Sequence, residues 1–429
     1  MNLILNKRLL IPAIILLGAY NILPIGLLSY KNLDPLKLIT ILLLFIGLIQ
    51  TKNLFEKDNK YVSFFICSIF LSVLNMFSRG KYLDWTFFYC LNYLNFFVLL
   101  KAFQKSYDIN DYLNLLLVLS LLASLLHAIF FINPDLLTGV LTDIRMGSIN
   151  YDTTKLRIFI PGMGFIAICF TYLICKIFYY KKLNYWEFAL LGLFFLSIFI
   201  FSSVRTNLLG LFICILVFLM TGKLSFKSIL IFTLTGAAML SILALISTDL
   251  YQFIASRFDI FFKLGDFKLL DVLNLDIDYD NETTWGTIYF RILEVIYVLQ
   301  NFTGDLKSIL LGNIGILYDF LGVEQEPAPH VGIVGIYYLF GLVGLITFLI
   351  MFVKFSKILI QNVYKTKNTK FEFLSLSLVV IWFSLFAISL FGGVYYSELI
   401  LLVTFVMAAA VFIKNKFANE GIEDQCSNA

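Results

Sequence analysis

Seven arginines are the side chains of this chain best suited to bind an anion, and they are unevenly distributed along the apolar pattern. If the first apolar run enters the membrane from the inner side, Arg8 alone lies inside. The other six lie on the outer side: Arg79, Arg145, Arg157, Arg205, Arg257 and Arg291. A guanidinium group binds phosphate or carboxylate through two parallel hydrogen bonds, whereas a lysine ammonium acts as a compact charge. The uneven distribution predicts an anion-binding site on the outer side.

Arg205 is the strongest candidate for this site. It lies in SSVRTN, a link of a few residues between two apolar runs. An arginine there is costly unless it reaches water or a partner. Ser202, Ser203, Thr206 and Asn207 add hydrogen-bond donors around it. The structural alternative is an arginine that extends to lipid headgroups, and we favour ligand binding.

Arg157 and Arg291 are the next candidates. Arg157 opens the apolar run LRIFIPGMGF, in which Pro161 and two glycines loosen the helix and let the backbone approach a ligand. The alternative for Arg157 is an interfacial anchor. Arg291 could instead pair with Glu294 on its own helix, a contact worth only a few tenths of a kcal/mol.

Arg257 and the two histidines complete the set. Arg257 could flank a surface helix and contact anionic lipid. His330 stands just before a late apolar run, where an imidazole could act as a general base near neutral pH; a histidine at a helix start is more often structural. His127 lies within an apolar run, and a packed histidine is the favoured interpretation. Arg79 and Arg145 are weaker candidates than the other outer arginines.

The composition describes what must position these residues. Of 429 residues, 60% are hydrophobic and 14% are charged, and the mean hydropathy is +0.90. Apolar runs of about 18–23 residues recur, each long enough to cross the hydrocarbon core as a helix. The sequence therefore predicts an all-α polytopic membrane protein with about twelve transmembrane helices. They lie roughly at residues 9–29, 37–50, 61–77, 84–103, 112–133, 157–179, 185–202, 205–221, 227–247, 331–353, 372–392 and 395–413.

Basic residues in the short loops orient these spans. With the N-terminus inside, 19 of the 32 lysines and arginines fall on the inner side. The predicted organisation is nine spans in residues 1–247, a large outer loop in 248–330, three spans in 331–413 and a cytoplasmic tail in 414–429. This orientation places both termini on the inner side and the large loop outside. No cleavable signal peptide is expected, because the first apolar run is long and lacks an A-x-A site.

The outer loop is expected to be partly helical and folded against the membrane. Residues 250–264 present an apolar stripe that suits a surface helix, and residues 285–301 suggest a second helix. A glycine-punctuated apolar segment follows. The loop holds thirteen acidic and five basic residues, so it is a poor phosphate binder on its own. We expect it to act as a lid over the outer ends of the spans.

Several segments resemble the bacterial O-antigen polymerase/ligase superfamily, most closely its O-antigen and capsule repeat-unit polymerases (Wzy-type). The resemblance covers the layout of the whole chain: its size, about twelve spans and a large late outer loop. The short motifs that carry it are RIFIPGMGFIA (157–167), SSVRTNLLGL, RILEVIYVLQN…LLGNIG (291–315) and HVGIVGIYYLFGLVGLITFLI (330–350). Two features depart from the family pattern. Val331 follows the histidine where many relatives have Asn, and the arginine-to-glycine spacing in the loop is not the commonest one.

The resemblance implies a GT-C-like membrane glycosyltransferase without cofactor or metal. It also implies a location in the bacterial inner membrane, with both termini cytoplasmic and the loop periplasmic. Such enzymes transfer glycan from polyprenyl diphosphate to a hydroxyl of a second lipid-linked repeat unit, with inversion. On this basis Arg157, Arg205 and Arg291 would bind the donor diphosphate, and Arg257 the second lipid's diphosphate. His330 would orient or deprotonate the acceptor hydroxyl. The expected catalytic residues are His330, Arg205 and Arg291.

Other interpretations stay open at this stage. The nearest is a ligase that transfers the same donor to lipid A core, and a lipid-linked oligosaccharide flippase is the alternative from another class. A first-loop aspartate is the base in one class of membrane glycosyltransferases, and Asp34 is the one candidate here, which we do not favour. No spacing of Cys and His residues suits a metal. The expected partners are undecaprenyl-diphosphate-linked oligosaccharide, membrane lipid, a chain-length regulator and a flippase, with no nucleic acid.

Overall fold

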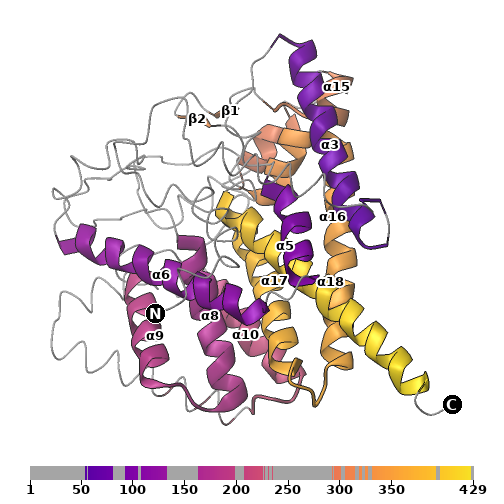
Figure 1. Ribbon diagram of the computed structural model, residues 1–429. Helices are drawn as coiled ribbons and strands as arrows, with labels where there is room; N and C mark the ends of the chain where they lie inside the picture. Colours follow the sequence, from indigo (N-terminus) through magenta and orange to yellow (C-terminus); the bar gives the residue numbers. More distant parts are fainter. Residues whose placement is uncertain are drawn as a thin grey trace.

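The computed structural model shows a bundle of apolar helices (Figure 1). It describes residues 54–55, 57–80, 92–104, 108–132, 163–198, 207–225, 227, 230, 234, 292, 294–300, 305–314, 318–320, 324–326, 331–392 and 397–426. Five helices in these ranges are long and apolar enough to cross a membrane: Asn59–Ser78, Ile109–Ile129, Gly332–Lys365, Glu372–Ser389 and Leu399–Phe417. These five helices agree with an all-α membrane protein. The predicted spans at 9–29, 37–50 and 227–247 lie outside the described residues, apart from a few isolated positions of the last.

The helices follow the apolar runs of the sequence. They are α3 (Asn59–Ser78), α5 (Asn95–Gln104), α6 (Ile109–Ile132), α8 (Met163–Tyr180), α9 (Tyr185–Leu196), α10 (Asn207–Met220), α15 (Leu306–Leu311), α16 (Gly332–Lys365), α17 (Glu372–Gly392) and α18 (Ser397–Cys426). A 3-10 turn, η1 (Asn92–Leu94), precedes α5, and two short antiparallel strands, β1 (Tyr318–Phe320) and β2 (Glu324–Glu326), form a hairpin.

Of the helix predicted at 84–103, the structure describes the part from Asn92, as a 3-10 turn followed by α5. Two features differ from the sequence-based expectation. The predicted span at 331–353 continues to Lys365, because no proline or glycine interrupts its polar second half. The last helix also continues beyond residue 413, through Gly421, to Cys426. Apolar periodicity marks where a helix lies in lipid, but the backbone hydrogen bonds of the helix can continue beyond that boundary into water.

The core is built from aromatic rings where α3, α5, α16 and α18 meet. Phe65 lies edge-on to Tyr93, with ring centroids 4.9 Å apart, and Phe96 lies edge-on to Phe355 at 5.8 Å. The middle of α18 is buried on every side: residues 404–410 are at most 1% exposed. A helix that is apolar all round belongs in the centre of a bundle, and α18 has that place.

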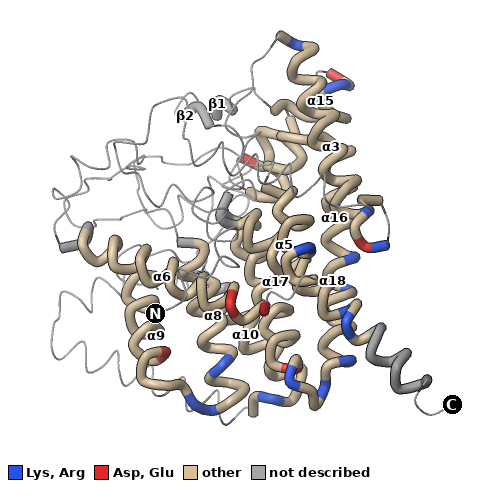
Figure 2. Tube along the Cα trace, in the orientation of Figure 1, with Lys and Arg blue, Asp and Glu red and all other residues tan. Residues whose placement is uncertain are grey.

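One end of the bundle is closed by a polar cluster around Glu372, which we call the Glu372 cluster. Lys223, just beyond α10, pairs with the Glu372 carboxylate at 2.8 Å, and the Tyr179 hydroxyl near the end of α8 donates to it at 3.0 Å. The backbone N–H of Asn368, in the turn after α16, donates to the same carboxylate at 3.1 Å. Figure 2 shows blue basic segments around these helix ends. Helices α8, α10 and α16 therefore all run toward this end, and α17 starts from it.

Candidate functional site

The five residues predicted for the site all lie outside the described residues: Arg157, Arg205, Arg257, Arg291 and His330. The structure does describe the helices that follow three of them. Helix α8 begins at Met163, α10 at Asn207 and α16 at Gly332. These three helices run in the same direction toward the Glu372 cluster, so each begins on the side away from it. Helix α10 begins beside the middle of α16, because Gly210 lies against Ser384 of α17, close to Trp382, which bonds Ser356 of α16.

Described parts of the predicted outer loop lie on that side of the bundle. Residues 294–300 are helical, in agreement with the second predicted loop helix, and Glu294 and Val298 are buried. Helix α15 then packs against both α3 and α16 (Figure 1). This part of the loop is therefore a structural part of the helix bundle.

Two glycines allow α15 to contact the backbone of α16. Gly312 ends α15 with φ of 80° and Gly341 interrupts α16 with φ of 65°, values that favour glycine over residues with a Cβ. A Cβ on Gly312 would lie 2.5 Å from the Phe340 N atom, and one on Gly341 would lie 2.5 Å from the Leu311 N atom. The Asn313 N–H donates to the Tyr338 carbonyl at 2.8 Å. The kink in α16 and the end of α15 thus fit together backbone to backbone.

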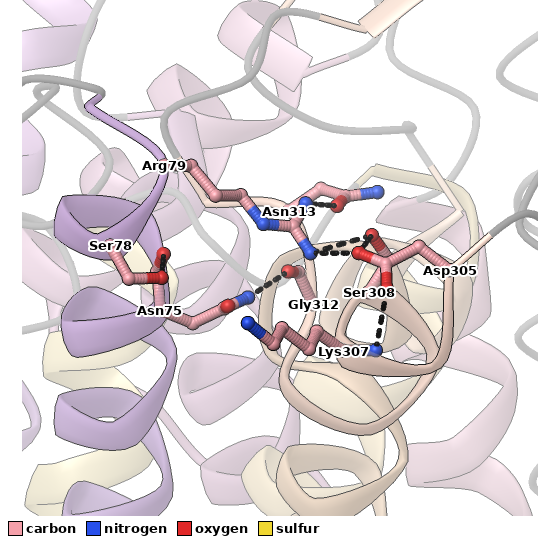
Figure 3. A network of polar contacts seen from close by, with 8 residues as sticks. All are labelled: Asn75, Ser78, Arg79, Asp305, Lys307, Ser308, Gly312 and Asn313. Atoms are coloured by element: carbon pink, nitrogen blue, oxygen red, sulfur yellow. Dashed lines mark hydrogen bonds and ion pairs between the residues drawn. The ribbon is translucent and has the colours of Figure 1, made fainter.

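Arg79, at the end of α3, joins this contact through its guanidinium group (Figure 3). It donates to the Asp305 carboxylate at 2.6 Å, to the Ser308 hydroxyl at 2.9 Å and to the Asn313 side-chain carbonyl at 3.1 Å. The neighbouring Asn75 amide donates to the Gly312 carbonyl at 3.2 Å. We call this group, with α15, the Arg79 anchor. It couples α3 to a segment more than two hundred residues later in the chain.

Asp305 has two roles in the Arg79 anchor. Its side chain accepts the Lys307 backbone N–H at 3.1 Å and so caps the start of α15, a common role for aspartate. This hydrogen bond, together with the charge of Arg79 and the Ser308 hydroxyl, holds the pKa of Asp305 below its ordinary value, although partial desolvation opposes the shift. The carboxylate is therefore ionised throughout the neutral range.

Arg79 is bound to protein groups and serves as a structural anchor. The sequence placed Arg79 among the weaker anion-site candidates, and its three protein partners give the physical reason: its donors are already used within the fold. The sequence did not identify its partners Asn75, Asp305 and Asn313. The Asp–x–x–Ser pattern at 305–308, which resembles a helix cap, was the available signal.

His127 is the second sequence candidate that the structure describes. It is fully buried in α6, as the packed interpretation expects. Within the described part of the chain, neither of its ring nitrogens has a hydrogen-bond partner. Ser120 and Ser124 are also buried and lie on the same face of α6.

Groups of acidic, histidine and cysteine side chains that could hold a metal do not occur among the described residues. Asp34 and Arg145 lie outside them. Of the cysteines, Cys175 and Cys214 approach to 3.5 Å between their sulfurs in the buried contact of α8 with α10, and both are free thiols.

Comparison with models of known protein families finds no match. Comparison with curated proteins finds none either.

Proposed function

We propose that the protein is a polysaccharide repeat-unit polymerase that transfers glycan from a polyprenyl diphosphate to the terminal sugar of another lipid-linked repeat unit. One observation carries the proposal beyond the sequence. Helices α8, α10 and α16, which follow Arg157, Arg205 and His330, all run in the same direction, from the side of the bundle away from the Glu372 cluster toward that cluster. The Arg79 anchor fixes α15, which belongs to the predicted outer loop, on that same side.

The chemistry requires cations, because the leaving diphosphate carries two to three negative charges. Preorganised guanidinium groups stabilise such a charge best where water is excluded. In the proposal, Arg157, Arg205 and Arg291 bind the donor diphosphate, and Arg257 binds the diphosphate of the second lipid.

The acceptor hydroxyl oxygen attacks the anomeric carbon of the donor sugar. The bond from that carbon to the diphosphate oxygen breaks, and its electron pair stays with the departing polyprenyl diphosphate. His330 orients the hydroxyl or takes its proton. Attack from the face opposite the leaving group inverts the configuration. The proposed reaction needs no nucleotide sugar and no metal.

The test is alanine substitution at Arg205, Arg291 and His330, scored by the ladder of surface glycan at matched protein level. Lys357→Ala is the matched control, because it removes an exposed charge from α16 away from the proposed site. We expect the three variants to lose the ladder and the control to keep it. An unchanged ladder in all three variants would refute the mechanism.

The same gel distinguishes the alternatives. A cell without a polymerase still displays a single repeat unit on its lipid core, whereas a cell without the ligase displays none. A flippase defect leaves lipid-linked units on the inner side of the membrane, where an external glycosidase cannot reach them. Only the single-unit pattern agrees with the proposal.

A further inference from the structure

A groove of about 250 Å³ lies between α3 and α16. It is lined by Tyr61, Phe64, Cys67, Ser68, Leu71, Val343, Thr347 and Ile350. Phe64, Leu71 and Ile350 are each about half exposed, so the groove opens on the outside of the bundle. It is separate from the Arg79 anchor and from the proposed active site.

The groove suits a hydrocarbon chain. The two hydroxyl groups in its lining already have hydrogen-bond partners within the protein. The Thr347 hydroxyl donates to the Ser68 hydroxyl at 3.1 Å, and the Ser68 hydroxyl donates to the Phe65 carbonyl at 2.6 Å. The remaining lining is almost entirely apolar. Both helices are candidate membrane spans, so hydrocarbon is the medium that faces this surface.

The length of the groove matches one leaflet. Its lining on α3 runs from Tyr61 to Leu71, eleven residues that span about 15 Å of helix. The hydrocarbon core is about 30 Å thick, and α3 with its twenty residues covers that distance. The groove therefore occupies the half of the span next to the start of α3, away from Arg79.

Lysines surround the end of the groove at Tyr61. The ammonium groups of Lys60 and Lys354 each lie 5.3 Å from the centre of the Tyr61 ring. Lys414 contacts Asp58 at 2.5 Å, and Lys354 lies 4.0 Å from the same carboxylate. The carboxylate offsets only part of this positive charge, and basic groups beside spans attract anionic lipid headgroups.

We propose that this groove binds one hydrocarbon chain of an anionic phospholipid, whose headgroup contacts Lys60 and Lys354. The ligand belongs to the leaflet at the start of α3, which the orientation of the spans predicts to be cytoplasmic. A polyprenyl diphosphate bound at the proposed active site would have its headgroup at the other end of the bundle. The lipid site does not depend on the proposed function.

The site is tested by native mass spectrometry of the full chain released from detergent. The probe added is phosphatidylglycerol, phosphatidylcholine or undecaprenyl phosphate. Replacing both Lys60 and Lys354 with alanine is expected to weaken phosphatidylglycerol binding roughly 30-fold, at about fivefold for each lysine. Lys365→Ala with Lys367→Ala is the control that removes the same charge elsewhere. Leu71→Trp is expected to fill the groove and displace the lipid. Leu74→Trp, on the same helix but outside the lining, is expected not to.

Each outcome decides the proposal. The proposal is supported if the protein selectively retains phosphatidylglycerol, if the Lys60/Lys354 and Leu71 variants lose this retention, and if both controls keep it. Equal retention of phosphatidylcholine, an unchanged Leu71→Trp variant, or displacement of phosphatidylglycerol by undecaprenyl phosphate overturns it. Thermal unfolding of each variant verifies that the fold is intact, and Leu71 is exposed enough for a larger ring to be tolerated.

Discussion

Replacing Gly341 with alanine is the most direct test of how the loop is attached to the bundle. Gly341 has φ of 65° and ψ of −166°, a conformation that is essentially restricted to glycine and costs other residues about 1–3 kcal/mol. The new Cβ would also lie 2.5 Å from the Leu311 N atom. Because that atom belongs to the backbone, no side-chain rotation relieves the clash, and overpacking of this kind costs about 1–3 kcal/mol.

The two costs together come to roughly 2–6 kcal/mol. They fall on the contact between α15 and α16, so the expected response is local release of α15. A cost of about 2 kcal/mol raises the population of the released state about 30-fold. Hydrogen exchange of the peptide covering residues 305–314 measures the release of α15 directly, because the Asn313 N–H donates to the Tyr338 carbonyl when α15 is packed on α16.

Two other glycines separate the sources of the cost. Gly192 lies within α9, and a Cβ added to it would have no other atom within 4 Å, so alanine there is expected to be neutral or stabilising by up to about 1 kcal/mol. Gly222 has φ of 68° but open space around it, so alanine is expected to cost only about 1–2 kcal/mol. If exchange at 305–314 in Gly341→Ala were no faster than in Gly192→Ala, the backbone contact would not hold the loop.

Three further predictions concern single contacts. Arg79→Gln removes the ion pair with Asp305, and we expect faster hydrogen exchange at residues 305–314. Lys307→Gln, the control, is expected to leave that exchange rate unchanged. Equal effects of the two substitutions would contradict the anchor role of Arg79. The pKa of Asp305 is lowered in the folded protein, so its stabilising contribution is present above the unfolded value of about 3.9 and is lost as the pH falls through the lower folded value. Exchange at 305–314, corrected for its intrinsic rate, should therefore stay flat from pH 7 to about 4 and rise only below, and Asp305→Asn should remove that acid step. Trp382→Phe deletes the hydrogen bond from the indole N–H to the Ser356 hydroxyl, 2.8 Å long, and should lower the free energy of unfolding by roughly 1–2 kcal/mol; a double-mutant cycle with Ser356→Ala should show coupling, and strict additivity would exclude the bond.

The described helices show how far apolar pattern alone predicts this fold. The predicted span at 372–392 coincides with α17, and the one at 61–77 lies within α3. These agree because a run of apolar residues in lipid must satisfy its backbone internally as a helix. The continuation of α16 to Lys365 and of α18 to Cys426 was not predicted, because the hydropathy pattern ends at the membrane surface while the helical hydrogen bonds do not.

Composition and the spacing of apolar runs determined by themselves that the chain is an all-α membrane protein, since burial in lipid is a property of each segment. The residue types also led to the prediction of a diphosphate site at the outer arginines and of a role for His330 at the acceptor hydroxyl, and these residues lie outside the described ones. Only the tertiary structure decided the role of Arg79, because its partners Asp305 and Asn313 are more than two hundred residues away. It also decided why Gly312 and Gly341 are glycines, because their constraint is a close approach of two backbones that no local pattern records.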